Sequence, residues 1–114
     1  GFSDYNKVKT ASSEHMALLH RVADKKLEIK SDVKAAYYDV KTAEKQVKAA
    51  NKRVETASSA LAITENRFRE GLSKITELLD REVDLKEAEL SLYISEYQLI
   101  ITKAKLLYTA GILN

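Results

Sequence analysis

Apolar residues recur at alternating steps of three and four positions through the middle of the chain, which is the spacing of helices that pack along a seam. The repeat continues without a break over more than five heptads. Its members are Val33, Ala36, Val40, Ala43, Val47, Ala50, Val54, Ala57, Leu61, Thr64 and Phe68. A less regular continuation runs back toward the amino terminus, so we predict one long helix over about residues 4–70. At about 1.5 Å per residue, this helix would be roughly 100 Å long.

The two positions of this seam differ in size, since one line is mostly valine and the other mostly alanine. Alanine has little bulk, so a partner helix can approach closely, although each alanine contributes less than the roughly 1.5–3 kcal/mol of a buried leucine or valine. A second line of mostly small residues runs beside the seam: Ala35, Thr42, Ala49, Thr56 and Ile63. The long helix is therefore expected to pack tightly on one partner and to have room for another.

The second arm, predicted as a helix over about residues 74–110, carries two apolar stripes. One seam consists of Leu79, Val83, Lys86, Leu90, Tyr93, Tyr97, Ile100, Ala104 and Leu107. The other repeats every seven residues as Leu78, Leu85, Leu92, Leu99 and Leu106. Adjacent positions are about 100° apart on a helix, so both stripes cannot face one partner. We expect this arm to touch two neighbours and assign the leucine stripe to packing between hairpins.

The two arms are separated by a short tip at residues 70–74. Gly71 can adopt the left-handed conformation that closes a helix, and Ser73 is a suitable N-cap for the next one. A stop and a start so close together favour antiparallel neighbours. The predicted fold is all-α: one long, coiled-coil-like antiparallel helical hairpin over residues 1–114. Gly111 is expected to cap the second helix at its carboxyl end.

Folding the arms back at the tip brings Leu107 opposite Ala36. Residues 4–35 then have no partner within the chain, although their seam requires one. Further copies or further segments of a parent protein are the expected partners.

Composition agrees with long helices, because the chain has no proline, three glycines and 32% charged residues. The absence of cysteine excludes disulfides and thiolate metal sites. A formal net charge of +2 is too small to indicate nucleic-acid binding.

Catalytic chemistry has little support. His15 and His20 are five residues apart, whereas two metal ligands on one helix face need a spacing of three or four. No nucleophile with a base and no phosphate-binding loop is visible, so we predict no enzyme activity, cofactor or metal.

Acidic residues spaced 3-4-3 form a strip on one face of the second arm: Glu77, Asp80, Asp84 and Glu87. For a single hairpin this is an ordinary solvated face with Arg81 and Lys74 as local partners. In a ring of such helices the same strip would line an opening and attract cations. Leu72, apolar at an expected turn, either closes the cap against Phe68 or Ile75 or docks a partner.

The tip sequence resembles a known family. The residues from Arg67 through Gly71-Leu72-Ser73 to Asp80, with the ending Leu106-Leu107-Tyr108-Thr109-Ala110-Gly111, resemble the second periplasmic hairpin of TolC-like outer-membrane efflux proteins. The stretch Val33-Lys34-Ala35-Ala36-Tyr37-Tyr38 resembles the family's V-x-x-A-Y segment in the preceding helix.

This resemblance implies a homotrimeric export duct for small molecules in the outer membrane of a Gram-negative bacterium, with this segment in the periplasm and membrane contact made elsewhere in the parent. The implied partners are a periplasmic adaptor protein and an inner-membrane pump, and no nucleic acid. The docking tip would be Glu70, Gly71, Leu72 and Ser73. Glu77 and Asp80 would narrow the entrance.

Two other classes share the helical arms. A structural coiled-coil module would use the acidic strip only for solubility. The α-hairpin of a periplasmic adaptor, or membrane fusion, protein would be flanked by β segments in its parent.

Overall fold

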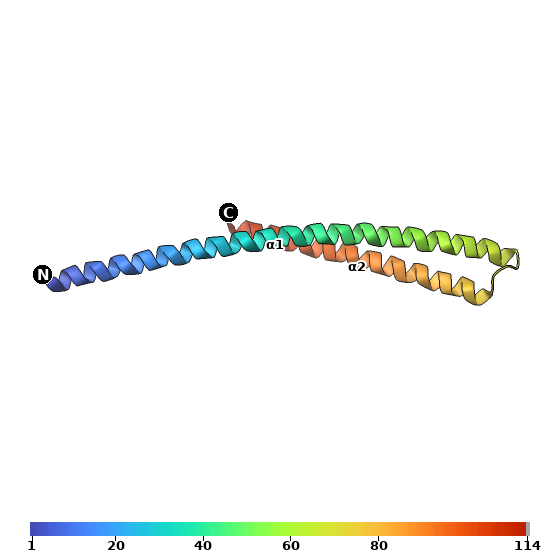
Figure 1. Cartoon of the computed structure of the whole chain (residues 1–114), viewed down its shortest axis with the longest axis horizontal. Helices are drawn as coiled ribbons and strands as arrows, with labels where there is room; N and C mark the ends of the chain where they lie inside the picture. Colours follow the sequence, from blue (N-terminus) through green and yellow to red (C-terminus); the bar gives the residue numbers. More distant parts are fainter. Residues whose placement is uncertain (114) are drawn as a thin grey trace.

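Two long helices and one short turn make up the fold (Figure 1). The computed structural model describes residues 1–113, with side chains described up to residue 111. Helix α1 spans Phe2–Arg69 and helix α2 spans Ile75–Leu113. The molecule measures 104 × 21 × 13 Å. The residues that the structure describes contain no strand, which confirms the all-α hairpin.

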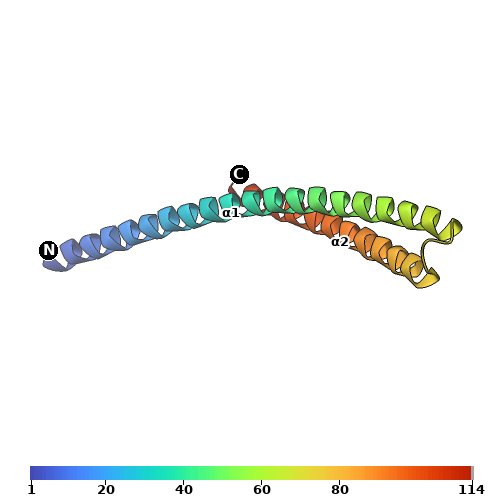
Figure 2. The ribbon, with the colours of Figure 1, turned by 45° about the vertical axis from the view of Figure 1, so that its right-hand side comes forward.

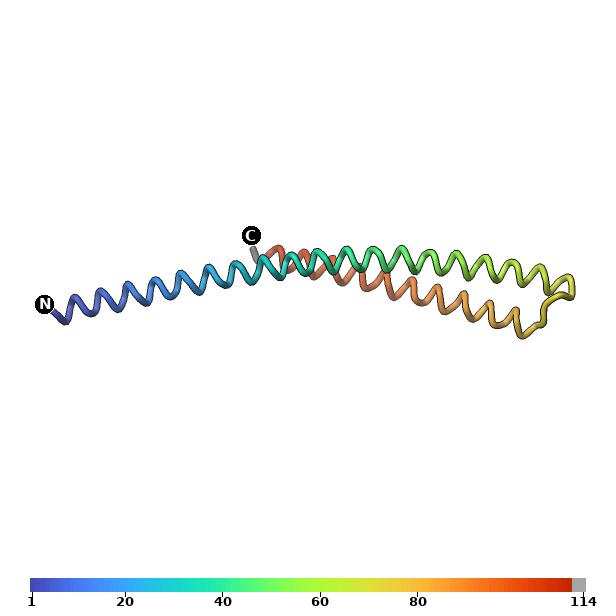
Figure 3. The backbone as a smooth tube through the Cα atoms, viewed as in Figure 1, coloured from blue at the N-terminus to red at the C-terminus, as the bar shows by residue number. Residues whose placement is uncertain are grey.

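The helices run side by side along one half of α1 (Figures 1 and 2). In Figures 1 and 2, α2 lies along the carboxyl-terminal half of α1, and the amino-terminal half of α1 continues alone. The tube in Figure 3 shows the same sharp reversal at the tip. All side chains from residue 1 to residue 28 are exposed. Within the described residues no element covers this part of α1, whereas Ile29 and Val33, inside the range of residues 4–35 that was expected to lack a partner, are half-buried.

The predicted seam of α1 is the face that packs on α2. Ala36, Val40, Ala43 and Ala50 are buried. The remaining seam residues from Val33 to Thr64 are half-buried, and Phe68 at the end is 39% exposed. Because α2 is the only other element among residues 1–113, their burial comes from contact with it. The alternating valine and alanine positions form the core of the hairpin.

The leucine stripe of α2 forms the other side of this core. Its members Leu78, Leu85, Leu92, Leu99 and Leu106 are all half-buried. Ala88, between two of them, is 0% exposed. In this chain the leucines thus close the hairpin against α1, and their assignment to packing between hairpins stays a prediction.

The second apolar seam of α2 is exposed along its whole length. Leu79 is 52% exposed, Tyr97 is 65% exposed and Leu107 is 74% exposed. Counting 100° per residue, this seam lies roughly 150° around the helix from the middle of the buried face, which comprises the leucine stripe and the line of residues that includes Ala88 and Ser95. The helix is therefore apolar on two nearly opposite faces, and α1 covers one of them. We call the uncovered face the outer seam, consisting of Leu79, Val83, Lys86, Leu90, Tyr93, Tyr97, Ile100, Ala104 and Leu107.

A hydrogen bond between the helices indicates their register. The Nη1 atom of Arg53 donates to the Oγ atom of Ser91 at 3.0 Å. Counting outward from this pair along both helices brings Leu107 level with Tyr37, one residue from the predicted Ala36. The ion pairs in the described part of the chain join residues three apart on one helix, so they do not hold the helices together.

Gly111 does not end the second helix. It lies inside α2, and among the described residues Gly71 alone has a positive φ. The prediction of a C-cap at Gly111 is therefore wrong. A glycine within a helix costs only about 1 kcal/mol relative to alanine, so its presence alone does not terminate the helix.

Candidate functional site

The tip begins with a complete Schellman motif at the end of α1. The amide of Gly71 donates to the carbonyl oxygen of Phe68 at 3.1 Å, and the amide of Leu72 donates to that of Arg67 at 2.8 Å. Gly71 has a φ of 73°, a backbone angle that residues with a Cβ rarely adopt. A Cβ built on Gly71 would meet no atom within 4 Å. The glycine is therefore required by backbone conformation and not by space, as predicted.

Ser73 does not serve as the N-cap of α2. The helix begins at Ile75, and the carbonyl oxygen of Lys74 accepts hydrogen bonds from the amides of Glu77 at 3.1 Å and Leu78 at 3.3 Å. These bonds put the cap at Lys74, so the predicted N-cap is wrong by one residue. The Ser73 hydroxyl instead accepts a hydrogen bond from the Nε atom of Arg67 at 3.1 Å.

An apolar surface surrounds this turn. Leu72 is 62% exposed, Ile75 is 50% exposed and Phe68 is 39% exposed. Leu72 is therefore mostly accessible to solvent, whether or not it contacts Phe68 or Ile75. The end of the hairpin thus presents a leucine side chain on a turn that is tied down by backbone hydrogen bonds.

The acidic strip begins within the first turn of α2. Its four members, Glu77, Asp80, Asp84 and Glu87, are exposed. Arg81 pairs with Asp84 at 3.0 Å, as expected for a local partner. Within residues 1–113 no ion pair links Lys74, Glu77, Asp80 or Glu87 to another residue. Three of the four carboxylates therefore keep their charge uncompensated by a direct ion pair.

The strip lies on a third face of α2. Helical geometry places it roughly 100° from the middle of the face that packs on α1 and a similar angle from the outer seam. Neighbours that cover both apolar faces would therefore leave the acidic side chains in contact with water.

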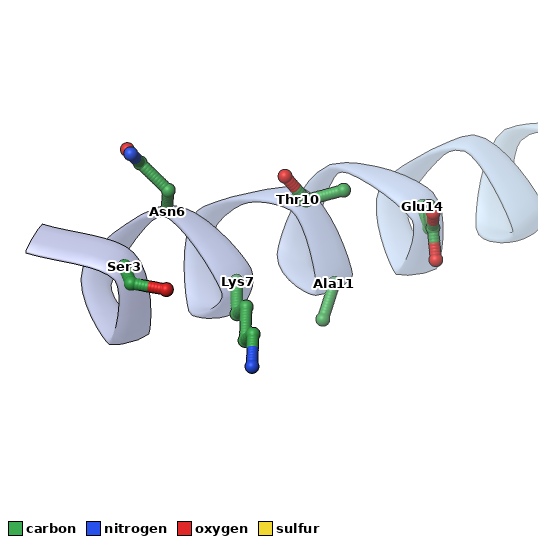
Figure 4. Close-up of a pocket in the computed structure, with 6 residues that line it drawn as sticks. All are labelled: Ser3, Asn6, Lys7, Thr10, Ala11 and Glu14. Atoms are coloured by element: carbon green, nitrogen blue, oxygen red, sulfur yellow. The ribbon is translucent and has the colours of Figure 1, made fainter.

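Other polar groups do not converge on a site. His15 and His20 are exposed on the unpartnered part of α1. The part of the chain that the structure describes has no group of three or more His, Cys, Asp or Glu side chains able to hold a metal ion. The residues in Figure 4, from Ser3 to Glu14, line one stretch of a single exposed helix without a covering element.

Neither described helix combines the length and apolar character needed to cross a bilayer.

Comparison with known proteins identifies the family. A family model described as "Outer membrane efflux protein" matches residues 3–111. The chain belongs to the outer membrane efflux protein family. Comparisons with curated proteins and with solved structures found no match. The family match confirms the TolC-like resemblance carried by the tip.

Membership in the outer membrane efflux protein family has general consequences. The family consists of channel-type transport proteins and not of enzymes, and it implies an outer-membrane location in Gram-negative bacteria. Its proteins assemble as trimers and work with adaptor and pump partners. These features argue against a purely structural coiled coil and against the hairpin of an adaptor protein.

Arg67 begins the tip stretch that carries the resemblance of this efflux protein to its family, but no role was predicted for its side chain. Its side chain reaches forward to the turn, where its Nη2 atom also donates to the carbonyl oxygen of Leu72 at 3.5 Å. The only signal in the sequence is an arginine in the last turn of a helix, six residues before a serine.

Proposed function

We propose that this chain is a wall element of the periplasmic tunnel of an outer-membrane efflux channel. Its tip docks the adaptor protein, and its acidic strip lines the entrance through which small molecules leave the cell. The observation that carries this proposal is the pair of opposite apolar faces on α2, of which α1 covers one. A helix within a closed wall has a neighbour on each side, whereas a helix in a free hairpin has one.

The outer seam has the properties of an interface. Monomeric proteins rarely expose long contiguous apolar surfaces, because removing such area from water stabilises by about 25 cal/mol per Å². The seam includes four bulky side chains that are each at least 64% exposed: Tyr93, Tyr97, Ile100 and Leu107. Burial of these residues against an adjacent hairpin would complete the packing of α2.

The first helix offers a matching surface. The line of Ala35, Thr42, Ala49, Thr56 and Ile63 is exposed in the hairpin. Mostly small side chains on one hairpin can accept bulky side chains from the next. The predicted second neighbour of α1 would thus be the outer seam of α2 on another hairpin. Packing between hairpins through Leu78, Leu85, Leu92, Leu99 and Leu106 would then be confined to their edges, because α1 already covers them.

In such a wall the acidic strip is placed to act on permeating ions. Neighbours on both sides of α2 leave its third face directed to the inside or the outside of the tunnel. Three copies of Glu77 and Asp80 around one opening would concentrate negative potential there.

Docking at the tip is tested by replacing the residues that form it. Leu72→Asp and Gly71→Pro in the full-length parent should each reduce site-specific cross-linking to the adaptor by about tenfold, which corresponds to about 1.4 kcal/mol. Aspartate removes the apolar contact. Proline cannot adopt a φ of 73° and removes the amide that donates to Phe68. Ser58→Asp, an exposed position away from the tip, is the control. Unchanged cross-linking in both tip variants would contradict the docking assignment.

The entrance assignment is tested by electrical recording. Glu77→Gln combined with Asp80→Asn should reduce the preference of the reconstituted parent for cations over anions by at least about twofold, because the negative potential at the opening is lost. Glu96→Gln, on a different face of α2, is the matched control and should leave selectivity unchanged. Identical current–voltage curves for the double variant and the unaltered channel would rule out an entrance lined by these residues.

A further inference from the structure

One arginine joins the end of α1 to two successive residues of the tip. The main-chain carbonyl oxygen of Arg67 accepts the amide of Leu72 at 2.8 Å. Its Nε atom donates to the Ser73 hydroxyl at 3.1 Å, and its Nη2 atom donates to the Leu72 carbonyl oxygen at 3.5 Å. Leu72 is therefore held through both its amide and its carbonyl group by the same residue.

This arrangement depends on the shape of the guanidinium group. Its N–H donors are fixed in one plane, so two of them can reach separate acceptors without independent ordering of each donor. A lysine carries a single nitrogen on a flexible chain and cannot reproduce this fork. Within residues 1–113 Arg67 forms no ion pair. Its side-chain contacts at the tip are to neutral oxygen atoms.

Comparison with Arg69 shows that a positive charge at the end of α1 does not by itself place an arginine side chain on the turn. Both arginines lie in the last turn of α1, where a positive charge interacts favourably with the helix dipole. The Nη1 atom of Arg69 donates to Asn66 Oδ1 at 3.4 Å, within the same helix. Of these two arginines, Arg67 is the one whose side chain is bonded to the turn.

We infer that Arg67 is a positioning residue for docking, because it fixes the backbone that carries the exposed Leu72. This inference rests on the proposed function of the tip. A partner that binds a flexible turn must also order it, and that ordering reduces affinity. With Leu72 held at both of its main-chain polar groups, the ordering has taken place before the partner arrives.

We call the side-chain hydrogen bonds of Arg67 to Leu72 and Ser73 the clip. Amide hydrogen exchange on the chain without its partner tests whether the clip holds the turn. Arg67→Met removes the donors while keeping a long apolar stem, and it should accelerate exchange at the Leu72 amide by about 3- to 10-fold, as expected for the loss of one or two modest hydrogen bonds. Arg69→Met is the matched control and should change this rate less than about twofold. Arg67→Lys should behave like Arg67→Met. Unchanged exchange at Leu72 in Arg67→Met, with slow exchange in the middle of both helices retained, would overturn the inference.

A cross-linking experiment on the full-length parent is the second test of this inference. Arg67→Met should reduce cross-linking between the tip and the adaptor by about threefold or more, and Arg69→Met should not. If Leu72→Asp abolishes cross-linking while Arg67→Met leaves it unchanged, the inference fails and the proposed docking tip stands. If Leu72→Asp has no effect, the docking tip itself is wrong, and faster exchange in Arg67→Met would then show a clip without a docking role.

Discussion

Ala88→Leu is expected to destabilise the hairpin by about 1–3 kcal/mol, because extra methylene groups must enter a well-packed interface. Ala88 is 0% exposed and lies between half-buried leucines on the face of α2 that contacts α1. The opposing seam of α1 also uses small residues, so the two helices lie close together. A larger side chain must push the helices apart or adopt a strained rotamer.

The control for this substitution lies on the same helix. Ala104→Leu makes the same chemical change at an exposed position of the outer seam and should alter the free energy of unfolding by no more than about 0.5 kcal/mol. Thermal and urea unfolding of both variants, followed by circular dichroism, provide the comparison. Equal stability of the two variants would show that close approach at Ala88 does not hold the hairpin together.

Replacing two residues of the outer seam should prevent assembly of the full-length parent. Leu90 is 59% exposed and Tyr97 is 65% exposed in the hairpin. Leu90→Glu with Tyr97→Glu would remove about 3–6 kcal/mol of apolar burial from each interface, before the cost of placing charges there is counted. Assembly should therefore weaken by more than about 100-fold.

Measuring the folding of the hairpin distinguishes a loss of assembly from a loss of structure. Both positions face away from α1, so the double variant of the 114-residue chain should keep its helix content and its unfolding midpoint. Tyr37→Glu, which alters an exposed tyrosine of α1 on a different face from the line of Ala35 and Thr42, is the control for assembly. Sedimentation of the detergent-solubilised parent measures the outcome. A normal oligomer formed by the double variant would contradict the assignment of the outer seam as an interface.

The hairpin itself was predictable because three independent signals agree. Heptad spacing defines the seam of α1, Gly71 interrupts the helix, and counting back from the turn sets the register. Each signal depends on residues close in sequence or on a regular repeat, so tertiary structure is not needed to recognise it.

The face of α2 that packs on α1 was harder to predict, because both of its stripes are apolar. The difference lies in the residues between the leucines. Ala88, Ser95, Thr102 and Thr109 are small and permit the close approach that the alanine line of α1 requires. The outer seam, in contrast, has bulky residues at nearly every position. Size complementarity across the interface, and not hydrophobicity, decides which stripe is covered.

The details of the helix ends were predicted less well. Ser73 has the chemistry of an N-cap, but its hydroxyl is bonded to Arg67 and the helix starts one residue later than expected. Arg67 acts over a distance that no periodic pattern encodes. Its role depends on a long side chain crossing a turn whose shape is set by Gly71.

The central claim is that α2 is covered on both sides in the assembled channel, and thiol accessibility measures this most directly. The 114-residue segment has no cysteine, so Tyr97→Cys introduces its single thiol on the outer seam and Glu87→Cys a control on the acidic strip, with any cysteine elsewhere in the parent replaced by serine. In the assembled parent we expect the thiol at position 97 to react at least about tenfold more slowly with a polar reagent than in the 114-residue chain, because burial blocks access to the thiol. The thiol at position 87 should react at similar rates in both. Equal reactivity at position 97 in the assembled parent and in the separate hairpin would show that the outer seam remains in water and would contradict the tunnel wall.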